Sequence, residues 1–462
     1  MTTGRRDAVS EKYYLEFVII YTMTRVEKMI PGGMGLGIDE SGKKVFFWNA
    51  LPDELIEDFQ VVKNKSHYTE AIATKIKEPS EHRVEPKDTC FLSTSPWQII
   101  DYNYELELKQ SLVVEIFREH DIEIKTPPIF TDHRDYFYRN KMEYALYYEL
   151  SESKIKLAFH QRGSHKKIPI NHSSIERPEL FQKATEIIND LNSRHEEARK
   201  YQSLLLRCNQ KGKVSGGLYE NHRPHPIFPP LTDTILGHEY SYSPNGFFQI
   251  NLPVYEMALT EIKKYISTNE VLDLYSGVGT IGLSVARNHH LTLVECDKSA
   301  FGELKQNVAQ TASFESVRDD GSERRSAARN DRRRSREDEK LAFRIEATPG
   351  GRPKVDGPAR GGSQNKPLSD ISIKLSKSEE ALDYIRSNQT VILDPPRSGC
   401  DKKIIDRLNE VKPEKIIYLS CNPTTQARDI KLLLSSYSIE DIKTFNFFPH
   451  TPHIENLVIM SK

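Results

Sequence analysis

The sequence predicts an α/β protein in three parts, and three observations lead to this fold class. Residues 246–462 alternate short apolar runs with amphipathic or polar stretches, which is typical of a parallel sheet buried on both faces. A glycine-rich loop follows the first of these runs, as at the ligand-binding edge of an open α/β sheet. Residues 12–78 contain short strand-like runs at regular spacing, which predicts a small β-barrel. Residues 81–245 mix both patterns and are predicted to form a central α/β region.

Composition limits the classes of protein that the chain can belong to. Its 462 residues leave room for two or three domains, and 37% hydrophobic residues permit ordinary cores. A net charge of −1 excludes a strongly basic protein, so any nucleic-acid-binding surface must be local. The five cysteines are odd in number and widely scattered, which fits a reducing compartment. No stretch approaches about 18 apolar residues, so we expect a soluble cytoplasmic protein without a membrane segment.

The predicted barrel rests on strand-like runs that turn residues separate. Pro31-Gly32-Gly33 and Asp39-Glu40-Ser41-Gly42 are two of these turn signals. A barrel of such short strands is typical of oligonucleotide-binding domains, and other small β domains share the pattern, so both alternatives remain open. The predicted strands are residues 14–21, 44–48, 59–63 and 68–75.

In the central region, apolar residues at helical spacing predict helices at residues 104–120 and 178–200. Between the two helices, residues 136–141 form an aromatic and basic cluster. Aromatic side chains stack on bases and cations hold phosphates, so Arg139 and Lys141 are candidate RNA-binding residues. The alternative is a strand whose polar end faces solvent.

The C-terminal part is predicted to contain four buried strands and a last strand, with a helix at residues 281–287. The strands are residues 271–274, 291–294, 391–393, 416–419 and 456–460. Residues 318–367 do not fit this alternation, because they hold fourteen basic and nine acidic residues and almost no large apolar ones. Such a segment cannot bury enough surface to offset the entropy of ordering it. We therefore predict a disordered insertion between two strands.

The glycine-rich loop after the first strand is a candidate cofactor site. Gly277 and Gly279 let the backbone approach a ligand closely, and Glu295 stands at the end of the next strand. A carboxylate in that place can accept hydrogen bonds from both ribose hydroxyls. Gly277, Gly279 and Gly282 also match the spacing of dinucleotide sites, so the loop alone fits NAD as well as S-adenosylmethionine.

Three further segments carry chemically capable residues at strand ends. The Asp394-Pro395-Pro396-Arg397 segment follows a buried strand, and its prolines make a rigid loop, although an ordinary turn would look the same. Cys421 follows the next strand, where a catalytic thiolate would lie, although a lone buried cysteine is usually inert. Glu455 stands at the start of the last strand and is a candidate base.

Taken together and in order, these segments resemble the RNA uracil-C5 methyltransferase family, which includes transfer-RNA and 23S ribosomal-RNA enzymes. The resemblance covers essentially all of 246–462 apart from the insertion. Residues 33–37 and 48–54 resemble the TRAM barrel of many members, and residues 138–143 resemble the central-domain signature of the family. The matching C-terminal segments are residues 247–251, 272–280, Glu295, 394–397, 420–423 and 453–455.

The resemblance implies a Rossmann-like methyltransferase domain with an OB-like TRAM barrel and S-adenosylmethionine as cofactor. It implies that Cys421 attacks C6 of a uridine and that Glu455 removes the C5 proton. No metal is expected, because Cys90 has no nearby companion for the iron–sulfur cluster of many ribosomal-RNA members. The implied cofactor-binding residues are Gln249, Tyr275, Gly277, Thr280, Glu295 and Asp394.

The implied partner is RNA, and a monomer is expected. The TRAM-like segment favours 23S ribosomal RNA, transfer RNA is the alternative substrate, and the missing cluster ligands weaken the preference. A cytosine-C5 methyltransferase would share the covalent chemistry, but the resemblance groups Glu455 with the uracil enzymes. A non-catalytic RNA-binding protein on this fold would lack Cys421 or Glu455, and both are present. A nicotinamide dehydrogenase would not need either of them.

Overall fold

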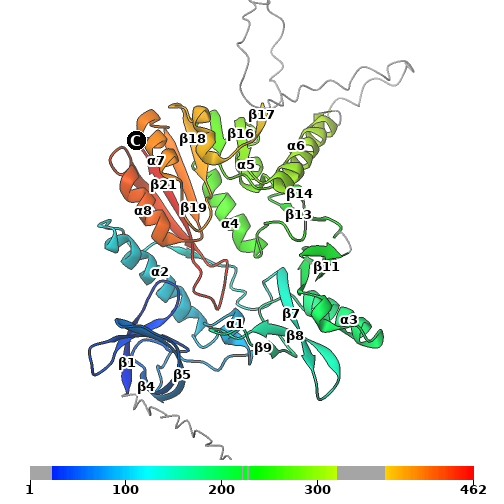
Figure 1. Ribbon diagram of the computed structural model, residues 1–462. Helices are drawn as coiled ribbons and strands as arrows, with labels where there is room; N and C mark the ends of the chain where they lie inside the picture. Colours follow the sequence, from blue (N-terminus) through cyan, green and yellow to red (C-terminus); the bar gives the residue numbers. More distant parts are fainter. Residues whose placement is uncertain (1–22, 221, 226–227, 320–369) are drawn as a thin grey trace, which may run out of the picture. The chain divides into compact units, whose positions relative to one another are not determined.

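The computed structural model describes residues 23–220, 222–225, 228–319 and 370–462 (Figure 1). Contacts divide the described chain into two units, one formed by residues 23–29 and 34–81 and the other by residues 30–33 and 82–462. The predicted strand 14–21 and residues 320–367 of the predicted insertion lie outside the described residues.

The first unit is a closed barrel with the strand order β1-β2-β3-β5-β4. Two of the strands were not predicted, because charged residues interrupt β1 and glycines make β2 look like a turn. Gly37 in β2 must be glycine, since a Cβ there would lie 2.6 Å from the carbonyl oxygen of Arg25. The buried core includes Val26, Phe47 and Phe59. The strands are β1 (Thr24–Met29), β2 (Gly35–Ile38), β3 (Lys44–Trp48), β4 (Leu55–Asn64) and β5 (Tyr68–Glu78).

The second unit begins with a short helix α1 (Phe91–Thr94) and the longer helix α2 (Tyr102–Glu119). Asp101 caps α2, because its side chain accepts hydrogen bonds from the backbone N–H groups of Asn103 and Tyr104. The prediction of a helix at residues 104–120 is therefore confirmed within two residues at the N-terminal end.

A six-stranded antiparallel sheet follows, with the order β12-β11-β10-β7-β8-β9. Helix α3 (Pro178–Ser193) packs on one face of this sheet through Leu180, Ala184 and Leu191. The predicted helix 178–200 is too long, because His195 adopts a positive φ of 55° and ends the helical path. The strands are β7 (Lys141–Glu149), β8 (Lys154–His160), β9 (Lys167–Pro169), β10 (Ser203–Cys208), β11 (Val214–Glu220) and β12 (Arg223–His225).

The C-terminal part forms an eight-stranded sheet with the order β17-β16-β15-β18-β19-β21-β20-β6. The expectation of a parallel sheet is right for β17 through β19 and wrong for β21, which runs antiparallel to both neighbours. Strand β6 comes from the central region and pairs with β20, which the sequence pattern did not indicate. The strands are β6 (Ile129–Phe130), β15 (Glu270–Asp273), β16 (His290–Glu295), β17 (Ile371–Leu375), β18 (Gln389–Leu393), β19 (Lys415–Ser420), β20 (Ser438–Phe445) and β21 (Glu455–Ser461).

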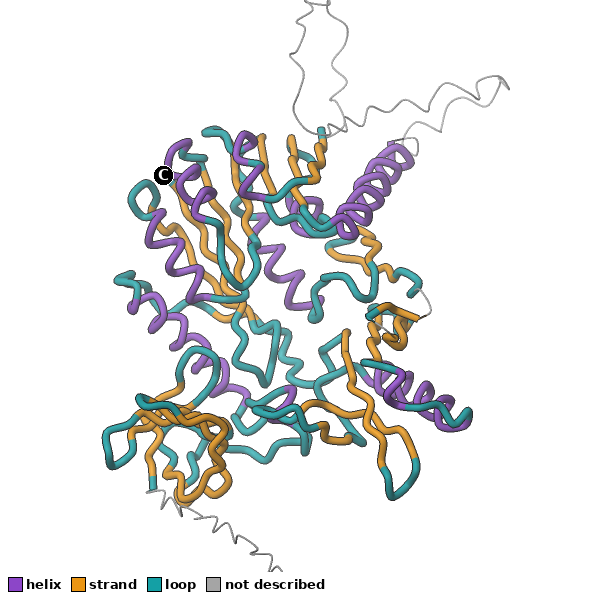
Figure 2. Tube along the Cα trace, viewed as in Figure 1, coloured by secondary structure: helices purple, strands orange, loops and turns teal. Residues whose placement is uncertain are grey.

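Helices cover both faces of this sheet, with α7 and α8 on one side and α4 and α5 on the other (Figures 1 and 2). Helix α5 is the predicted helix 281–287 and ends earlier, and α6 includes the first two residues of the predicted insertion. A hairpin of β13 (Leu231–Ile235) and β14 (His238–Tyr242) packs against α6. The helices are α4 (Leu252–Lys263), α5 (Thr280–Val285), α6 (Lys298–Asp319), α7 (Lys402–Val411) and α8 (Pro423–Leu433).

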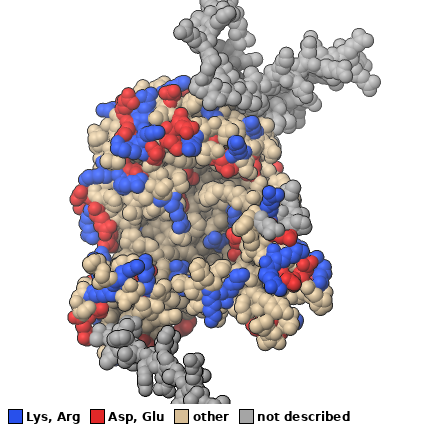
Figure 3. All heavy atoms as spheres, in the orientation of Figure 1, with Lys and Arg blue, Asp and Glu red and all other residues tan. Residues whose placement is uncertain are grey.

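The surface of the described chain does not carry one dominant charge. On the face shown in Figure 3, Lys and Arg side chains lie among Asp and Glu side chains, in keeping with the net charge of −1. None of the helices in the described part of the chain is long and apolar enough to cross a membrane.

Candidate active site

The carboxyl ends of neighbouring parallel strands gather the chemically capable residues at one edge of the eight-stranded sheet. Asp273 ends β15, Glu295 ends β16 and Asp394 directly follows β18. Cys421 directly follows β19. Strand β21 is antiparallel and pairs Asn456 with Ser420, so its first residue, Glu455, begins at the same edge. Residues that are far apart in the sequence therefore meet at one place.

The glycine loop between β15 and α5 leaves room for a ligand. Gly277 has a φ of 55°, and a Cβ added there would have no heavy atom within 4 Å, so space is open above the loop. Its N–H donates to Oε2 of Glu295 at 2.8 Å, and Oε1 of Glu295 accepts from the N–H of Asp297 at 2.6 Å. These bonds orient the Glu295 carboxylate beside the open space.

Asp273 lies below this loop and is fully buried. Its Oδ2 accepts a hydrogen bond from the N–H of Gly282 at 3.0 Å, while Oδ1 has no partner among the described residues. Burial raises the pKa of Asp273 to about 7, opposed by hydrogen bonds from backbone N–H groups. A buried oxygen without a partner is costly, and a ligand that donates a hydrogen bond would satisfy it.

Three other predicted cofactor residues are held by neighbours of their own. Tyr275 lies beside Cys400 and Ser378, and it lines a cavity of about 580 Å³ beside the loop after β18. The Thr280 hydroxyl lies 2.9 Å from the Tyr255 hydroxyl. Gln249 is buried, and its backbone oxygen accepts from Nδ2 of Asn140 at 3.2 Å. The hydrogen bonds around the loop therefore bring Gly277, Glu295 and Asp273 together, and contact of the other three with a cofactor stays a prediction.

Cys421 is half-buried and lines a pocket of about 200 Å³ with Arg397, Pro452 and His453. Burial is the main cause that raises the pKa of the Cys421 thiol to about 11, and the nearby Glu455 and Asp394 raise it further. The Arg397 guanidinium opposes them by its charge and by a hydrogen bond to the thiol. Arg397 is therefore the group that stabilises a thiolate here.

Glu455 is only 2% exposed. Burial raises its pKa well above the ordinary value, Asp394 raises it further, and Arg397 opposes the rise. Burial likewise raises the pKa of Asp394, with a smaller contribution from Asp273. The environment of Glu455 therefore favours its protonated form, and its carboxylate would be a stronger base than a solvated one.

Two side chains that follow β19 hold the loop after β18 in place by hydrogen bonds to its backbone. The side chain of Asn422 donates from Nδ2 to the Arg397 carbonyl at 2.9 Å, and the hydroxyl of Thr425 donates to the same oxygen at 3.2 Å. The Asn422 side chain also caps α8 by accepting from the N–H of Thr424. The segment that carries Cys421 therefore positions Arg397 as well.

If Arg397 stabilises the thiolate, then Arg397→Gln should slow alkylation of Cys421 by iodoacetamide at about pH 8. The substitution removes the positive charge that lowers the thiol pKa. A further rise of the thiol pKa by about one would reduce the thiolate fraction about tenfold. Peptide mass spectrometry can follow Cys421 with the exposed Cys296 as an internal reference. Equal Cys421 rates in wild type and variant would show that Arg397 has no such influence.

A buried ion pair on α2 holds the loop that leads into Glu455. Lys109 is fully buried and donates to Oε1 of Glu105 at 2.7 Å and to Oδ1 of Asn446 at 2.6 Å. Glu105 in turn accepts from the backbone N–H of His450 at 2.9 Å. His450 has a φ of 59°, so the carboxylate fixes a strained turn shortly before Glu455. Sequence reasoning missed this pair, because Glu and Lys four residues apart on a helix usually face solvent.

We expect Lys109→Met to lower the free energy of unfolding by about 3–5 kcal/mol, because Glu105 would be left buried without its partner charge. The double variant Glu105→Gln with Lys109→Met carries no buried charge at these positions and should recover much of the loss. Urea unfolding followed by tryptophan fluorescence gives both values. A single variant as stable as wild type would contradict the role of this ion pair.

The two predicted RNA-binding residues lie at the start of β7, and Lys141 has a structural role there. Its Nζ donates to the carbonyls of Asn245 at 3.1 Å and Gly246 at 3.0 Å. Burial lowers the pKa of Lys141 to about 8, and the neighbouring Arg207 contributes to the fall. Arg139 donates from Nε to the carbonyl of Lys141 at 2.9 Å. Contact of either side chain with RNA stays a prediction.

Comparisons with known proteins agree with this arrangement. A family model described as tRNA (Uracil-5-)-methyltransferase matches residues 379–462, and one described as Conserved hypothetical protein 95 matches residues 254–338. An uncharacterized RNA methyltransferase of Synechocystis sp. is 26% identical, over 100% of this chain and 99% of the relative. Another from Treponema denticola is 26% identical, over 95% of this chain and 99% of the relative.

Among solved structures, the chain resembles the Pyrococcus abyssi tRNA (uracil-54, C5)-methyltransferase in complex with S-adenosyl-L-homocysteine. The TM-score is 0.65 at 20% identity, and the match covers 95% of this chain and 100% of that one. This likeness shows that the two proteins share a fold. The relatives make this chain similar to RNA methyltransferases over nearly its whole length, and the family model relates its residues 379–462 to uracil-C5 methyltransferases.

Proposed function

We propose that this enzyme transfers a methyl group from S-adenosylmethionine to C5 of a uridine in RNA, with Cys421 as a covalent nucleophile. The observation that carries the proposal is the meeting of Cys421, Arg397 and Glu455 at the sheet edge that also holds the glycine loop. A thiol, a cation that stabilises its thiolate and a buried carboxyl are the groups that covalent activation of a pyrimidine needs.

The loop residues fit S-adenosylmethionine, which supplies an electrophilic methyl group on a sulfonium. The open space above Gly277 admits the ligand, and the oriented Glu295 carboxylate can accept the ribose hydroxyls. The unpartnered Oδ1 of Asp273 can accept from the ammonium group of the amino-acid portion, directly or through water. Gln249, Tyr275, Thr280 and Asp394 remain part of the proposed cofactor site.

In the proposed reaction Cys421 acts first. Its thiolate, stabilised by Arg397, forms a bond from Sγ to C6 of the uracil ring. The electrons of the C5–C6 double bond move onto C5 and the C4 carbonyl, so C5 becomes a nucleophile. The half-buried position of Cys421 in a small pocket keeps water away from this adduct.

Glu455 acts after C5 carries the methyl group. Its carboxylate takes the remaining proton from C5, the C5–C6 double bond forms again, and the bond from C6 to Sγ breaks. The low polarity that raises the Glu455 pKa also strengthens its carboxylate as a proton acceptor. The bond from the methyl group to the cofactor sulfur breaks in the transfer, so the products are a methylated uridine, S-adenosylhomocysteine, a protonated Glu455 and a free Cys421 thiolate.

The RNA must present an unstacked uridine, because C6 of a stacked base cannot be reached by Cys421. We propose that Arg139 and Lys141 help to hold the neighbouring strand, and that the enzyme works as a cytoplasmic monomer. The TRAM-like barrel favours 23S ribosomal RNA as the substrate. Transfer RNA is the second candidate, because the matched family model and solved structure both name transfer-RNA enzymes, and the latter match covers 95% of this chain.

Incubation of the enzyme with labelled cofactor and either unmodified 23S ribosomal RNA or unmodified transfer RNA would separate the two substrates. If ribosomal RNA is the substrate, the label should appear in the 23S ribosomal RNA. Label in transfer RNA alone would show that transfer RNA is the substrate instead. The Cys421→Ala variant is the blank in both samples.

A further inference from the structure

The central six-stranded sheet has a second face that α3 does not cover. Strand residues alternate between faces, and those in the core under α3 include Tyr144 on β7, Phe159 on β8 and Leu204 on β10. The cross-strand pairs Leu205 with Glu143, Ala145 with Ala158, and Ser203 with Tyr219 belong to the opposite face. Helix α3 contacts β8, β10 and β11 through the first face.

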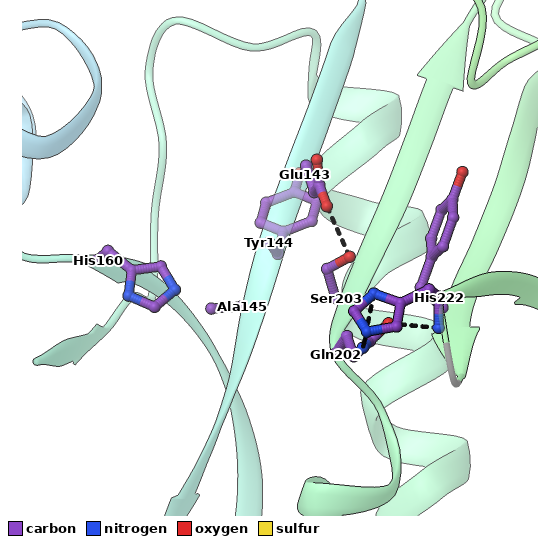
Figure 4. Close-up of a pocket in the computed structure, with 8 residues that line it drawn as sticks. Glu143, Tyr144, Ala145, His160, Gln202, Ser203 and His222 are labelled. Carbon is purple, nitrogen blue, oxygen red and sulfur yellow. Dashed lines mark hydrogen bonds between the residues drawn. The ribbon is translucent and has the colours of Figure 1, made fainter. Parts of the chain in front are cut away.

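A pocket of about 580 Å³ lies on this face, across strands β11, β10, β7 and β8 (Figure 4). Ala145 forms part of its floor, and the small side chain leaves a hollow between larger ones. His160 stands on one side of Ala145, and Gln202, Ser203 and His222 stand on the other side. A small apolar residue between rings and polar groups leaves room for a planar nucleobase.

The ring of Tyr219 at one wall is held in place by its neighbours. Phe228 packs edge-on against it with ring centroids 5.7 Å apart, and the side chain of Asn245 lies near its hydroxyl. A ring that is fixed before binding loses little entropy when a base stacks on it.

The polar groups of the pocket are also oriented in advance. Oε1 of Glu143 accepts from the hydroxyl of Ser203 at 2.7 Å, and no described residue donates to Oε2. Oε1 of Gln202 accepts from the N–H of His222 at 2.7 Å. The exposed Oε2 of Glu143 favours a base with an exocyclic amino group, which can donate to it, over uracil, whose one ring donor, N3–H, lies between two carbonyl oxygens that a carboxylate repels.

We propose that this pocket binds an unpaired, amino-bearing nucleobase of the RNA substrate, by stacking at Tyr219 and by a hydrogen bond to Glu143. The inference rests on the proposed function for its partner. It also follows from the position of the pocket, because Lys141, two residues before Glu143 on β7, donates to the carbonyls of Asn245 and Gly246.

The pocket therefore lies near the chain segment that leads to the active site. Along β7, Glu143 is two residues beyond Lys141, about 7 Å at the rise of an extended strand. Phe247, directly after this tie, is 75% exposed and apolar, as at a surface that RNA covers. The site would read a nucleotide of the same RNA as the methylated uridine, and it would give the enzyme sequence selectivity.

The test measures binding of two fluorescent RNA oligonucleotides of about 12 nucleotides, each with one central uridine, flanked by cytidines in one and by uridines in the other. Wild type should bind the cytidine-flanked RNA about fivefold more tightly. Glu143→Ala should abolish this preference, and Tyr219→Ala should weaken binding of both RNAs about tenfold. Tyr219→Phe keeps the ring and should restore most of the affinity. Ala145→Phe should fill the hollow and weaken binding without removing any polar group.

Tyr148→Ala is the matched control, because Tyr148 is an exposed tyrosine of β7 outside the pocket. Thermal unfolding of each variant identifies any that fail to fold. Folded Glu143→Ala and Tyr219→Ala variants that bind both RNAs like wild type would overturn the proposal. Methyl transfer to unmodified cellular RNA is measured in parallel with wild type. If wild type transfers no methyl group, the proposed function is refuted. The preference for the cytidine-flanked RNA, and the loss of this preference in Glu143→Ala, would still test base binding by the pocket.

Discussion

Replacement of Cys421 by alanine is expected to reduce methyl transfer on the order of 10⁴-fold or more, which is typical of the loss of a covalent nucleophile. The affinity for S-adenosylmethionine should stay nearly unchanged. The thiol lies in the pocket with Arg397 and His453, whereas the open space for the cofactor lies above Gly277. The variant should therefore bind the cofactor normally and leave the uracil ring unactivated.

Single-turnover assays with labelled cofactor measure the first effect, and calorimetric titration with S-adenosylmethionine measures the second. Cys90→Ala is the control, because it removes a buried thiol from the core of the central sheet and leaves the site intact. Turnover at the wild-type rate in Cys421→Ala would remove the covalent mechanism.

Replacement of Glu455 by glutamine is expected to stop the reaction after methyl transfer. Glutamine keeps the size of the side chain and cannot take the C5 proton, so Cys421 cannot leave C6. The product should be a protein–RNA adduct that carries the transferred methyl group and persists in denaturing electrophoresis. Single-turnover release of methylated RNA should fall by about 10²–10⁴-fold, the usual contribution of a general base.

The stability of this variant separates a catalytic role from a structural one. Burial raises the folded-state pKa of Glu455 above its unfolded value, so between these two pKa values the folded protein holds a proton that the unfolded chain has lost. Wild-type stability therefore falls as pH rises from the unfolded pKa towards the folded pKa. Glutamine imitates the protonated carboxyl, so the variant should be at least as stable as wild type at pH 7.

A purely structural Glu455, paired with a cation such as Arg397 or His453, predicts a different result. The variant would then lose stability and activity together, and no adduct would form. The double variant Cys421→Ala with Glu455→Gln is the matched control for the adduct band, because it lacks the sulfur that joins protein and RNA.

Much of the C-terminal fold could be predicted because its strands are buried on both faces. Residues 391–393 and 416–419 are continuous apolar runs, and both lie within strands β18 and β19. The antiparallel direction of β21 and the pairing of β6 with β20 depend on contacts between distant segments, which periodicity does not record. Residues at strand ends were predictable for the same reason as the strands, because parallel strands bring their carboxyl ends to one edge.

The sequence was less informative about groups whose role depends on burial or register. Asp273 lies within the predicted strand 271–274, yet its unpartnered oxygen emerges only from the packing around it. Lys109 and Glu105 look like an exposed helical pair and are fully buried. The pocket on the central sheet joins Glu143 and Ser203, and no local pattern predicts a contact between residues so far apart in the chain.

The central claim is tested most directly by the identity of the modified nucleoside. Unmodified RNA is incubated with the enzyme and methyl-labelled S-adenosylmethionine, digested to nucleosides and separated by liquid chromatography with mass spectrometry. The account predicts that the label appears as 5-methyluridine with wild type and is absent with Cys421→Ala. Label in 5-methylcytidine, in a ribose methyl group or in any other nucleoside, with none in 5-methyluridine, would contradict it.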